Sequence, residues 1–170
     1  MSVIEKPNLY KLYCDSLISH PAGRKDVTVQ FNLLFGEHRK HATITYFGDI
    51  TDEHVPVFDA LFDFMDELRG QSVEFIVTGR DNFGPKHDIP VLLVDFVDPK
   101  IKDLCVTFHQ RFGVPEPGFE KKLNVPSYHS SIKDESKLLD TPVGTKIIAT
   151  AVSVKRLGPI DPFYSILLKY

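Results

Sequence analysis

An internal repeat is the feature of this 170-residue sequence that most constrains its fold. The first copy runs from His41-Ala-Thr-Ile, through a β-rich run that ends in Phe-Gly-Pro, to the apolar segment Pro90-Val-Leu-Leu-Val. The second runs from His129-Ser-Ser-Ile, through a β-rich run that ends in Leu-Gly-Pro, to Pro162-Phe-Tyr-Ser-Ile-Leu-Leu. Because the segments follow one another in the same order, the sequence predicts a duplicated unit.

Short runs of β-branched and aromatic residues, bounded by Gly, Pro or Asp, predict six β-strands. These strands are expected at residues 27–35, 42–47, 73–78, 91–96, 147–155 and 164–168. Capping residues and apolar residues at helical spacing predict one helix within Thr51–Gly70 and a second within Asp98–Gly113. The Pro-, Gly- and charge-rich segments 16–25 and 113–126 are expected to be surface loops. The whole chain, 1–170, is predicted to form a single α+β domain.

Composition excludes several classes of function. The formal net charge of -3 gives no overall attraction to nucleic acid or to an anionic membrane, so any phosphate site must be built locally. Cys14 and Cys105 are too few and too far apart for a disulfide framework or a zinc site, which favours a reducing compartment. No segment approaches the ~20 apolar residues of a membrane span. We therefore expect a cytoplasmic protein with no membrane association.

The two His-x-Thr/Ser motifs are the candidate site. Alternate residues of a strand share a face, so His41, Thr43 and Thr45 are expected on one face, and His129, Ser131 and Lys133 on one face of another strand. If the two copies pack about an approximate two-fold axis, both pairs of imidazole and hydroxyl face one groove. A single His-x-Thr is common by chance, but two copies at equivalent positions of a repeat favour a functional pair over two core histidines, each of which would need buried polar partners.

This pattern suits the cleavage of a phosphodiester. One neutral imidazole can accept the proton of the attacking oxygen while the other, protonated, donates to the leaving oxygen, and both states are accessible near neutral pH. The hydroxyls of Thr43 and Ser131 can hold the non-bridging oxygens as charge develops. We therefore predict His41 and His129 as the acid/base pair, with Lys133 and Thr45 as further candidate substrate contacts.

The two motifs resemble those of the two-histidine (2H) phosphoesterases, which include the LigT-like RNA 2′,3′-cyclic phosphodiesterases and the ADP-ribose cyclic phosphodiesterases. His41-Ala-Thr43-Ile and His129-Ser-Ser131-Ile match the family pattern H-x-T/S-x, and the resemblance extends from about Val27 to the C-terminus. It implies a bilobal α+β fold with two pseudo-symmetric lobes of antiparallel sheet, helices packed outside and a central groove. One departure is Ser130, which replaces the usual hydrophobic residue.

Other residues give weaker signals. His38, Arg39 and Lys40 precede the first motif and are expected to form a solvated turn, although they add cations near the groove. Tyr46 and Tyr128 are expected in the core, on the strand faces opposite the histidines. Four histidines lack the motif setting and are expected to be surface or structural: His20, His54, His87 and His109. No metal-ligand motif, P-loop or serine-hydrolase elbow is present, so no metal and no cofactor are expected.

The predicted function is that of a metal-independent phosphodiesterase that acts where a ribose 2′-oxygen takes part. The candidate linkages are a 2′,3′-cyclic phosphate, an ADP-ribose cyclic phosphate, and a 2′,5′-linked or cyclic oligonucleotide. Two alternatives stay open: RNA 2′,5′ ligation or tRNA processing, and a non-catalytic nucleotide- or RNA-binding module. The expected partner is a nucleotide or oligonucleotide substrate, bound by a monomer.

Overall fold

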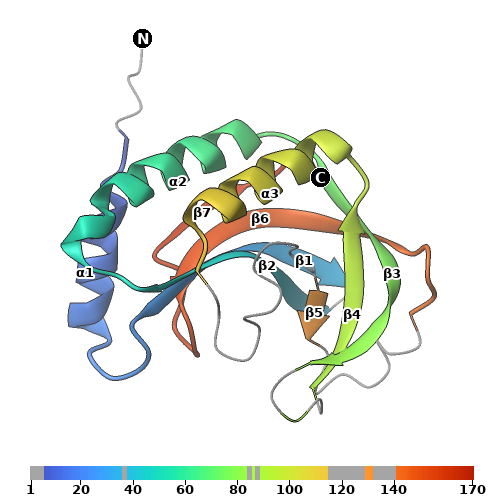
Figure 1. Cartoon of the computed structure of the whole chain (residues 1–170), viewed down its shortest axis with the longest axis horizontal. Helices are drawn as coiled ribbons and strands as arrows, with labels where there is room; N and C mark the ends of the chain where they lie inside the picture. The colour runs from blue at the N-terminus through green and yellow to red at the C-terminus, as the bar shows by residue number, and fades with distance from the viewer. Residues whose placement is uncertain (1–5, 36–37, 84–85, 87–88, 115–128, 132–140) are drawn as a thin grey trace.

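A computed structural model describes residues 6–35, 38–83, 86, 89–114, 129–131 and 141–170. Helices separate groups of two or three strands along the chain, in the order shown in Figure 1. The helices are α1 (Leu9–Ser19), η1 (Asp52–His54), α2 (Val55–Leu68) and α3 (Pro99–Phe112). The strands are β1 (Asp26–Phe35), β2 (His38–Asp49), β3 (Val73–Phe83), β4 (Ile89–Phe96), β5 (His129–Ser131), β6 (Lys146–Arg156) and β7 (Tyr164–Leu167). The predicted α+β class is confirmed.

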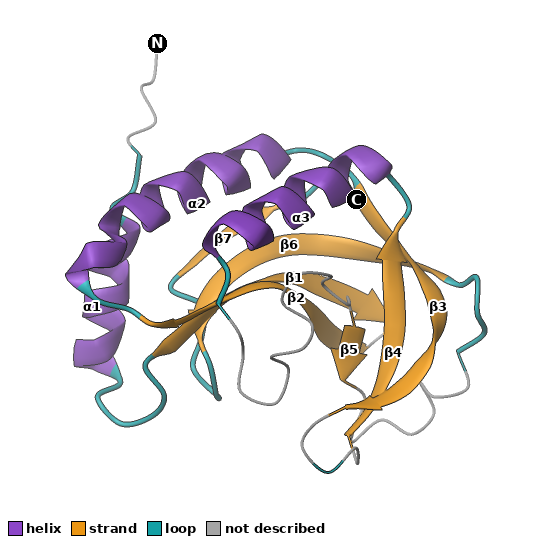
Figure 2. Ribbon diagram, in the orientation of Figure 1, coloured by secondary structure: helices purple, strands orange, loops and turns teal. Residues whose placement is uncertain are grey.

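All strands join one antiparallel, strongly curved sheet in the order β2-β1-β6-β3-β4-β5, with β7 beside β6 (Figure 2). Strand β6 holds two parts of the sheet together. Its first residues pair with β3, as in Ala149 with Val73, whereas its later residues pair with β7, as in Ala151 with Leu167. The sheet therefore divides into one half of β2, β1, β6 and β7 and another of β3, β4 and β5.

The repeat found in the sequence is visible in this topology, and its two copies are intertwined. Each copy forms one antiparallel pair, β3 with β4 in the first and β6 with β7 in the second. The histidine strand of the first copy, β2, joins the sheet through β1 beside β6 of the second copy. The histidine strand of the second copy, β5, pairs with β4 of the first. Each histidine strand thus lies in the half that contains the other copy's pair.

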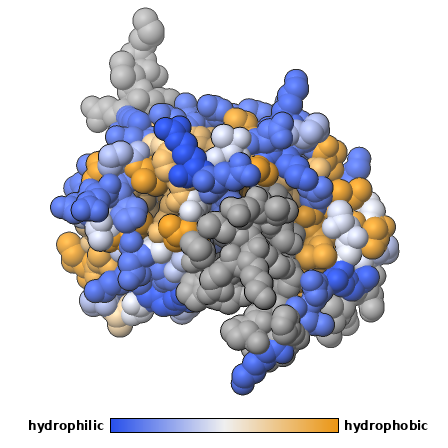
Figure 3. Space-filling model, viewed as in Figure 1, coloured by the Kyte–Doolittle hydropathy of each residue, from blue (hydrophilic) through white to orange (hydrophobic). Residues whose placement is uncertain are grey.

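The three α-helices cover one face of the sheet, and the core lies between them. In Figures 1 and 2, α2 and α3 run side by side above β6, and α1 stands at the end of α2. Alternate residues of β1 enter this core, namely Val27, Val29, Phe31 and Leu33. The outward surface of the helices is mostly hydrophilic in Figure 3. Because one sheet face is covered by helices, the polar residues that alternate with the core residues occupy the opposite face.

Both predicted helices are confirmed, with bounds that follow from their caps. Asp98 accepts a hydrogen bond from the backbone N–H of Lys100 (2.8 Å) and begins α3. The chain leaves α2 at Gly70, whose φ of 74° is a conformation that glycine adopts without strain. Helix α3 ends at Gly113, whose backbone is extended, and an added Cβ there would lie only 2.7 Å from the carbonyl oxygen of His109. The expectation of a loop at residues 113–126 falls mostly on residues outside those described.

Helix α1 was not predicted, and the expectation of a loop from residue 16 is wrong for residues 16–19. Asn8 caps the helix by accepting a hydrogen bond from the N–H of Lys11 (3.1 Å). Leu9 and Tyr13 are buried against α2, where Tyr13 packs on Phe58. The segment is short and has a weak hydrophobic pattern, so this tertiary packing stabilises a helix that local sequence signals do not mark strongly. No helix in the described part of the chain is long and apolar enough to cross a bilayer.

Candidate functional site

The two histidine motifs, 88 residues apart in the sequence, lie on the two end strands of the sheet. His41 is in β2 and His129 is in β5. The sheet curves until these two strands contact each other, with Cα atoms within 8 Å, as the ribbon in Figure 2 also shows. The backbone therefore brings together two strands that would be far apart in a flat sheet.

On the β2 side, the exposed His41 opens one of two rows of residues that run across four strands. The first row pairs His41 with Asn32 on β1, Asn32 with Ala151 on β6, and Ala151 with Leu167 on β7. Directly paired residues of an antiparallel sheet project from the same face. This row thus leads from an imidazole, over an amide and a small residue, to an exposed leucine.

The second row begins at Thr43 and is polar throughout. Thr43 pairs with Gln30, Gln30 with Ser153, and Ser153 with Ser165. The Asn32 side-chain amide donates a hydrogen bond to Ser153 Oγ (3.0 Å), and the hydroxyls of Ser153 and Ser165 are 2.8 Å apart. These hydrogen bonds satisfy the buried Ser153 and fix the orientation of Asn32 before any ligand binds.

A pocket of about 470 Å³ lies over these rows. Its polar side includes Gln30, Asn32, Lys40 and His41. Three large apolar side chains form its other side and are exposed by 42%, 74% and 73% respectively: Leu34, Leu167 and Tyr170. The pocket thus combines a cation, an imidazole and amides with an apolar, partly aromatic wall.

On the β5 side, the description is limited to the backbone. His129 pairs with Leu93, and Ser131 pairs with Val91, both on β4. Leu92, Val94 and Phe96 of β4 belong to the core, so Val91 and Leu93 alternate with core positions. Positions 129 and 131 are therefore in register with residues of β4 that alternate with its core residues. Lys133 lies outside the described residues.

Thr45 does not continue the row of His41 and Thr43. The β1–β2 register shifts between Val29 and Gln30, so Thr45 pairs with Val29, a core residue, and Ile44 is the extra residue of the bulge. Such a bulge interrupts the alternation of side chains. Thr45 is 0% exposed, and its hydroxyl has no hydrogen-bond partner among the described residues. The expected shared face of Thr45 is therefore wrong, and we omit Thr45 from the proposed substrate contacts.

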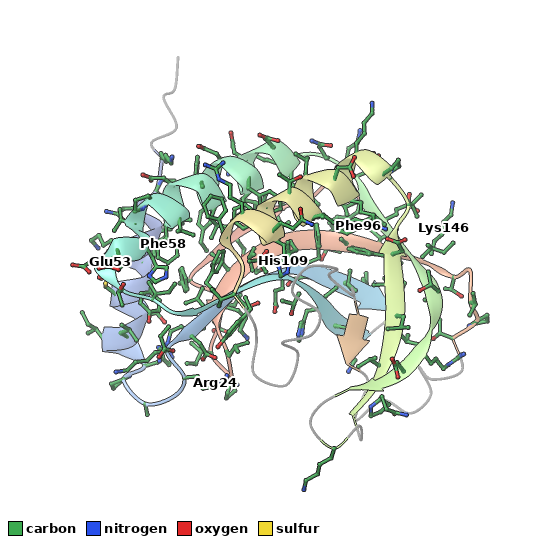
Figure 4. All side chains as sticks on the ribbon, viewed as in Figure 1. Arg24, Glu53, Phe58, Phe96, His109 and Lys146 are labelled. Carbon is green, nitrogen blue, oxygen red and sulfur yellow. The ribbon has the colours of Figure 1, made fainter. Side chains whose placement is uncertain are left out.

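The remaining tyrosine, histidine and cysteine side chains that the structure describes lie outside the pocket. Tyr46 is buried and donates a hydrogen bond to Asp26 Oδ2 (2.8 Å), but it pairs with Thr28, on the face of β1 that carries Gln30 and Asn32, so its expected place on the face opposite His41 is wrong. His109 is a buried residue of α3 on the side of the helix that faces the sheet (Figure 4), whereas His20 is exposed. Burial raises the pKa of the Cys105 thiol and keeps it protonated, as is usual for an inert core cysteine. His87, Tyr128 and the side chains of His38 and Arg39 lie outside the description.

Sequence reasoning missed the residues that surround His41, including Asn32, Gln30, Leu167 and Tyr170. A usable signal was present in β1, where Thr28, Gln30 and Asn32 alternate with Val27, Val29, Phe31 and Leu33. Such alternation indicates a strand with one polar face. The partners of that face could not be found without the strand order. Among the described residues, no group of three or more His, Cys, Asp or Glu residues is placed to hold a metal ion.

No protein-family model matches this chain, and no curated protein matches its sequence. Similar solved structures include Escherichia coli LigT complexed with NADP+, at 10% identity and a TM-score of 0.48, with 88% of this chain and 100% of LigT covered. LigT complexed with ATP gives 7% identity and a TM-score of 0.46, with coverages of 87% and 100%. A structure described as a phosphoesterase gives 12% identity and a TM-score of 0.44, with 98% of this chain and 96% of the other chain covered.

Proposed function

We propose that this protein is a metal-independent phosphodiesterase that cleaves a nucleotide or RNA phosphodiester involving a ribose 2′-oxygen. His41 and His129 act as the acid/base pair, and Thr43 and Ser131 hold the phosphate. The observation that carries the proposal is the contact between β2 and β5, the two strands on which the two His-x-Thr/Ser motifs lie. Contact between the two strands that carry the repeated motif favours a common role for the two motifs.

The side chains around His41 on β2 also support the proposed phosphodiesterase. His41 is exposed and lines one pocket together with Lys40, so an imidazole and a cation lie at the same end of this pocket. Thr43 is the next residue on the same strand that projects from that face, and it supplies a hydroxyl donor. A group that transfers a proton and groups that stabilise charge are the two requirements of phosphodiester cleavage. Lys133, four residues after His129, is proposed as a further phosphate contact.

Turnover of a substrate panel tests the proposal. The panel contains nucleoside 2′,3′-cyclic phosphates, ADP-ribose 1″,2″-cyclic phosphate and 2′,5′-linked dinucleotides, with a 3′,5′-linked deoxydinucleotide as the control that lacks the 2′-oxygen. We expect hydrolysis of at least one member and none of the control. Binding of these nucleotides without turnover of any of them would replace the proposed enzyme with a binding module.

Chelation should leave the activity intact. The proposed acid, base and phosphate contacts are all side chains, so no step of the proposed reaction needs a metal Lewis acid. Turnover is measured after dialysis against EDTA, then after addition of Mg²⁺, Mn²⁺ or Zn²⁺. Loss of activity with EDTA, restored by one of these ions, would show that the metal-free mechanism is wrong.

Thr43→Ala and Ser131→Ala should each weaken stabilisation of the transition state by about 2 to 4 kcal/mol, about 30- to 900-fold in turnover, because each removes one donor to the developing charge. Thr107→Ala, which removes an exposed hydroxyl from α3, serves as the matched control and should keep parental turnover. Thermal unfolding of each variant establishes that the fold persists. Parental turnover of Thr43→Ala would remove that hydroxyl from the site.

A further inference from the structure

We propose that the pocket beside His41 binds the nucleobase of the substrate, with Tyr170 as the aromatic surface on which the base stacks and Leu167 beneath it. This inference rests on the proposed function, because it takes the phosphate to lie at His41 and Thr43. It adds a subsite, a direction in which the substrate lies across the sheet, and a preference for substrates that carry a base.

The order of side chains across the sheet carries the inference. Starting at His41, the first row passes Asn32 and the small residue Ala151 before it reaches Leu167. The second row starts at Thr43 and remains polar as far as Ser165. A ligand with its phosphate at the β2 end therefore meets the amides of β1 first and an apolar surface at β7 last, with the small residue Ala151 between them.

The apolar side chains that line the pocket are unusually exposed to solvent. Leu167 and Tyr170 are 74% and 73% exposed, and Leu34, on the same pocket, is 42% exposed. Single exposed apolar residues are ordinary, but several that share one concave surface mark a binding site. The volume of about 470 Å³ is in the range of small-molecule sites.

A nucleobase fits this combination of walls. Its flat faces are apolar and stack on aromatic side chains, whereas its edges carry hydrogen-bond donors and acceptors. Tyr170 and Leu167 can contact the faces of the base, and the amides of Asn32 and Gln30 can form hydrogen bonds with its edge. The link from Asn32 to Ser153 and Ser165 holds that amide in place, which lowers the entropy cost of binding. A phosphorylated sugar without a base would leave the apolar wall unused.

The sharpest test compares two ligands that differ only in the base. Calorimetric titration gives the Kd of adenosine 2′-monophosphate and of ribose 2-phosphate for the parental chain and for each variant. Tyr170→Ala should weaken binding of the nucleotide by about 5- to 150-fold, the usual effect of losing one stacking partner, and leave the Kd of ribose 2-phosphate unchanged. Tyr170→Phe keeps the ring and should retain the affinity for the nucleotide. Ile18→Ala, which truncates a 79% exposed residue on α1, is the matched control.

The outcomes separate this inference from the proposed function. Equal affinity of the parental chain for both ligands, or equal loss of both in Tyr170→Ala, would overturn the base subsite even if the substrate panel is hydrolysed. Absence of turnover together with binding that depends on the base and on Tyr170 would overturn the enzyme and leave the subsite standing. Loss of nucleotide affinity in both Tyr170→Ala and Tyr170→Phe would assign the effect to the hydroxyl and contradict stacking.

Discussion

Replacement of His41 or His129 by Ala is expected to lower turnover by about two to four orders of magnitude, the usual contribution of one positioned general acid or base. The double variant should lose little more than the worse single variant, because two groups that act in one concerted transfer are strongly non-additive. His20→Ala is the matched control, since His20 is exposed at the end of α1 and outside the pocket. Initial rates at saturating substrate provide the measurement.

The pH profile of the same variants assigns the roles. The active state has one neutral and one protonated imidazole, so the rate should be bell-shaped around neutral pH. The base must be neutral, so its protonation produces the acidic limb; the acid must be protonated, so its loss of a proton produces the alkaline limb. Each single variant should flatten one limb. The apparent pKa values of the parental profile belong to the coupled pair rather than to either residue.

A result that contradicts the mechanism is easy to recognise. If either single variant retained parental turnover with an unchanged bell, that histidine would not transfer a proton. If the two losses were instead additive in free energy, the histidines would act in separate steps rather than in one transfer.

The sequence predicted most of the described fold because local signals and tertiary structure agree there. The run Thr51–Gly70 contains an acidic first turn, apolar residues at helical spacing and a glycine that ends the helix, and η1 and α2 form within it. Strand positions were also identified, but β2 and β3 are longer than expected. Their extra residues pair with neighbouring strands, and a local pattern contains no information about such pairing.

The site was less predictable than the fold. Both histidine motifs could be found from the repeat, but the strand order, which makes β2 and β5 the two ends of one sheet, could not be inferred from local patterns. The bulge at Ile44 was equally hidden, and it is the reason that Thr45 turns away from the row of Thr43. Leu167 and Tyr170 come from the end of the chain and reach His41 only through the order β2-β1-β6-β7.

The intertwined repeat explains why the site requires both copies. Each histidine strand pairs into the half of the sheet that contains the other copy's strand pair. One copy alone would therefore have a histidine strand without its neighbour in the sheet. The two motifs therefore meet only when the strands of both copies are in place in one sheet.

Arg156→Met is expected to destabilise the protein by about 3 to 5 kcal/mol, because three partly buried carbonyl oxygens lose a charged donor, at a cost of at least about 1 kcal/mol each. The Arg156 side chain is 0% exposed. Its Nε donates to the carbonyl oxygen of Arg24 (2.9 Å), and its Nη1 donates to those of Ser16 (3.0 Å) and His20 (2.9 Å). Ser16 and His20 lie at the C-terminal end of α1, where a cation is also favoured by the helix dipole.

Thiol labelling of the two cysteines can report the loss of stability separately for α1 and α3. Cys14 is half-buried on α1, whereas Cys105 is buried on α3. Methionine keeps an unbranched, apolar side chain but cannot donate, so Arg156→Met should release α1 and speed thiol labelling of Cys14, while Cys105 stays protected until the protein unfolds. Arg69→Met removes an exposed arginine that binds Asp66 and Tyr164, and it should cost less than about 1 kcal/mol in urea unfolding. Equal stability of the two variants, with unchanged labelling of Cys14, would show that Arg156 does not anchor α1.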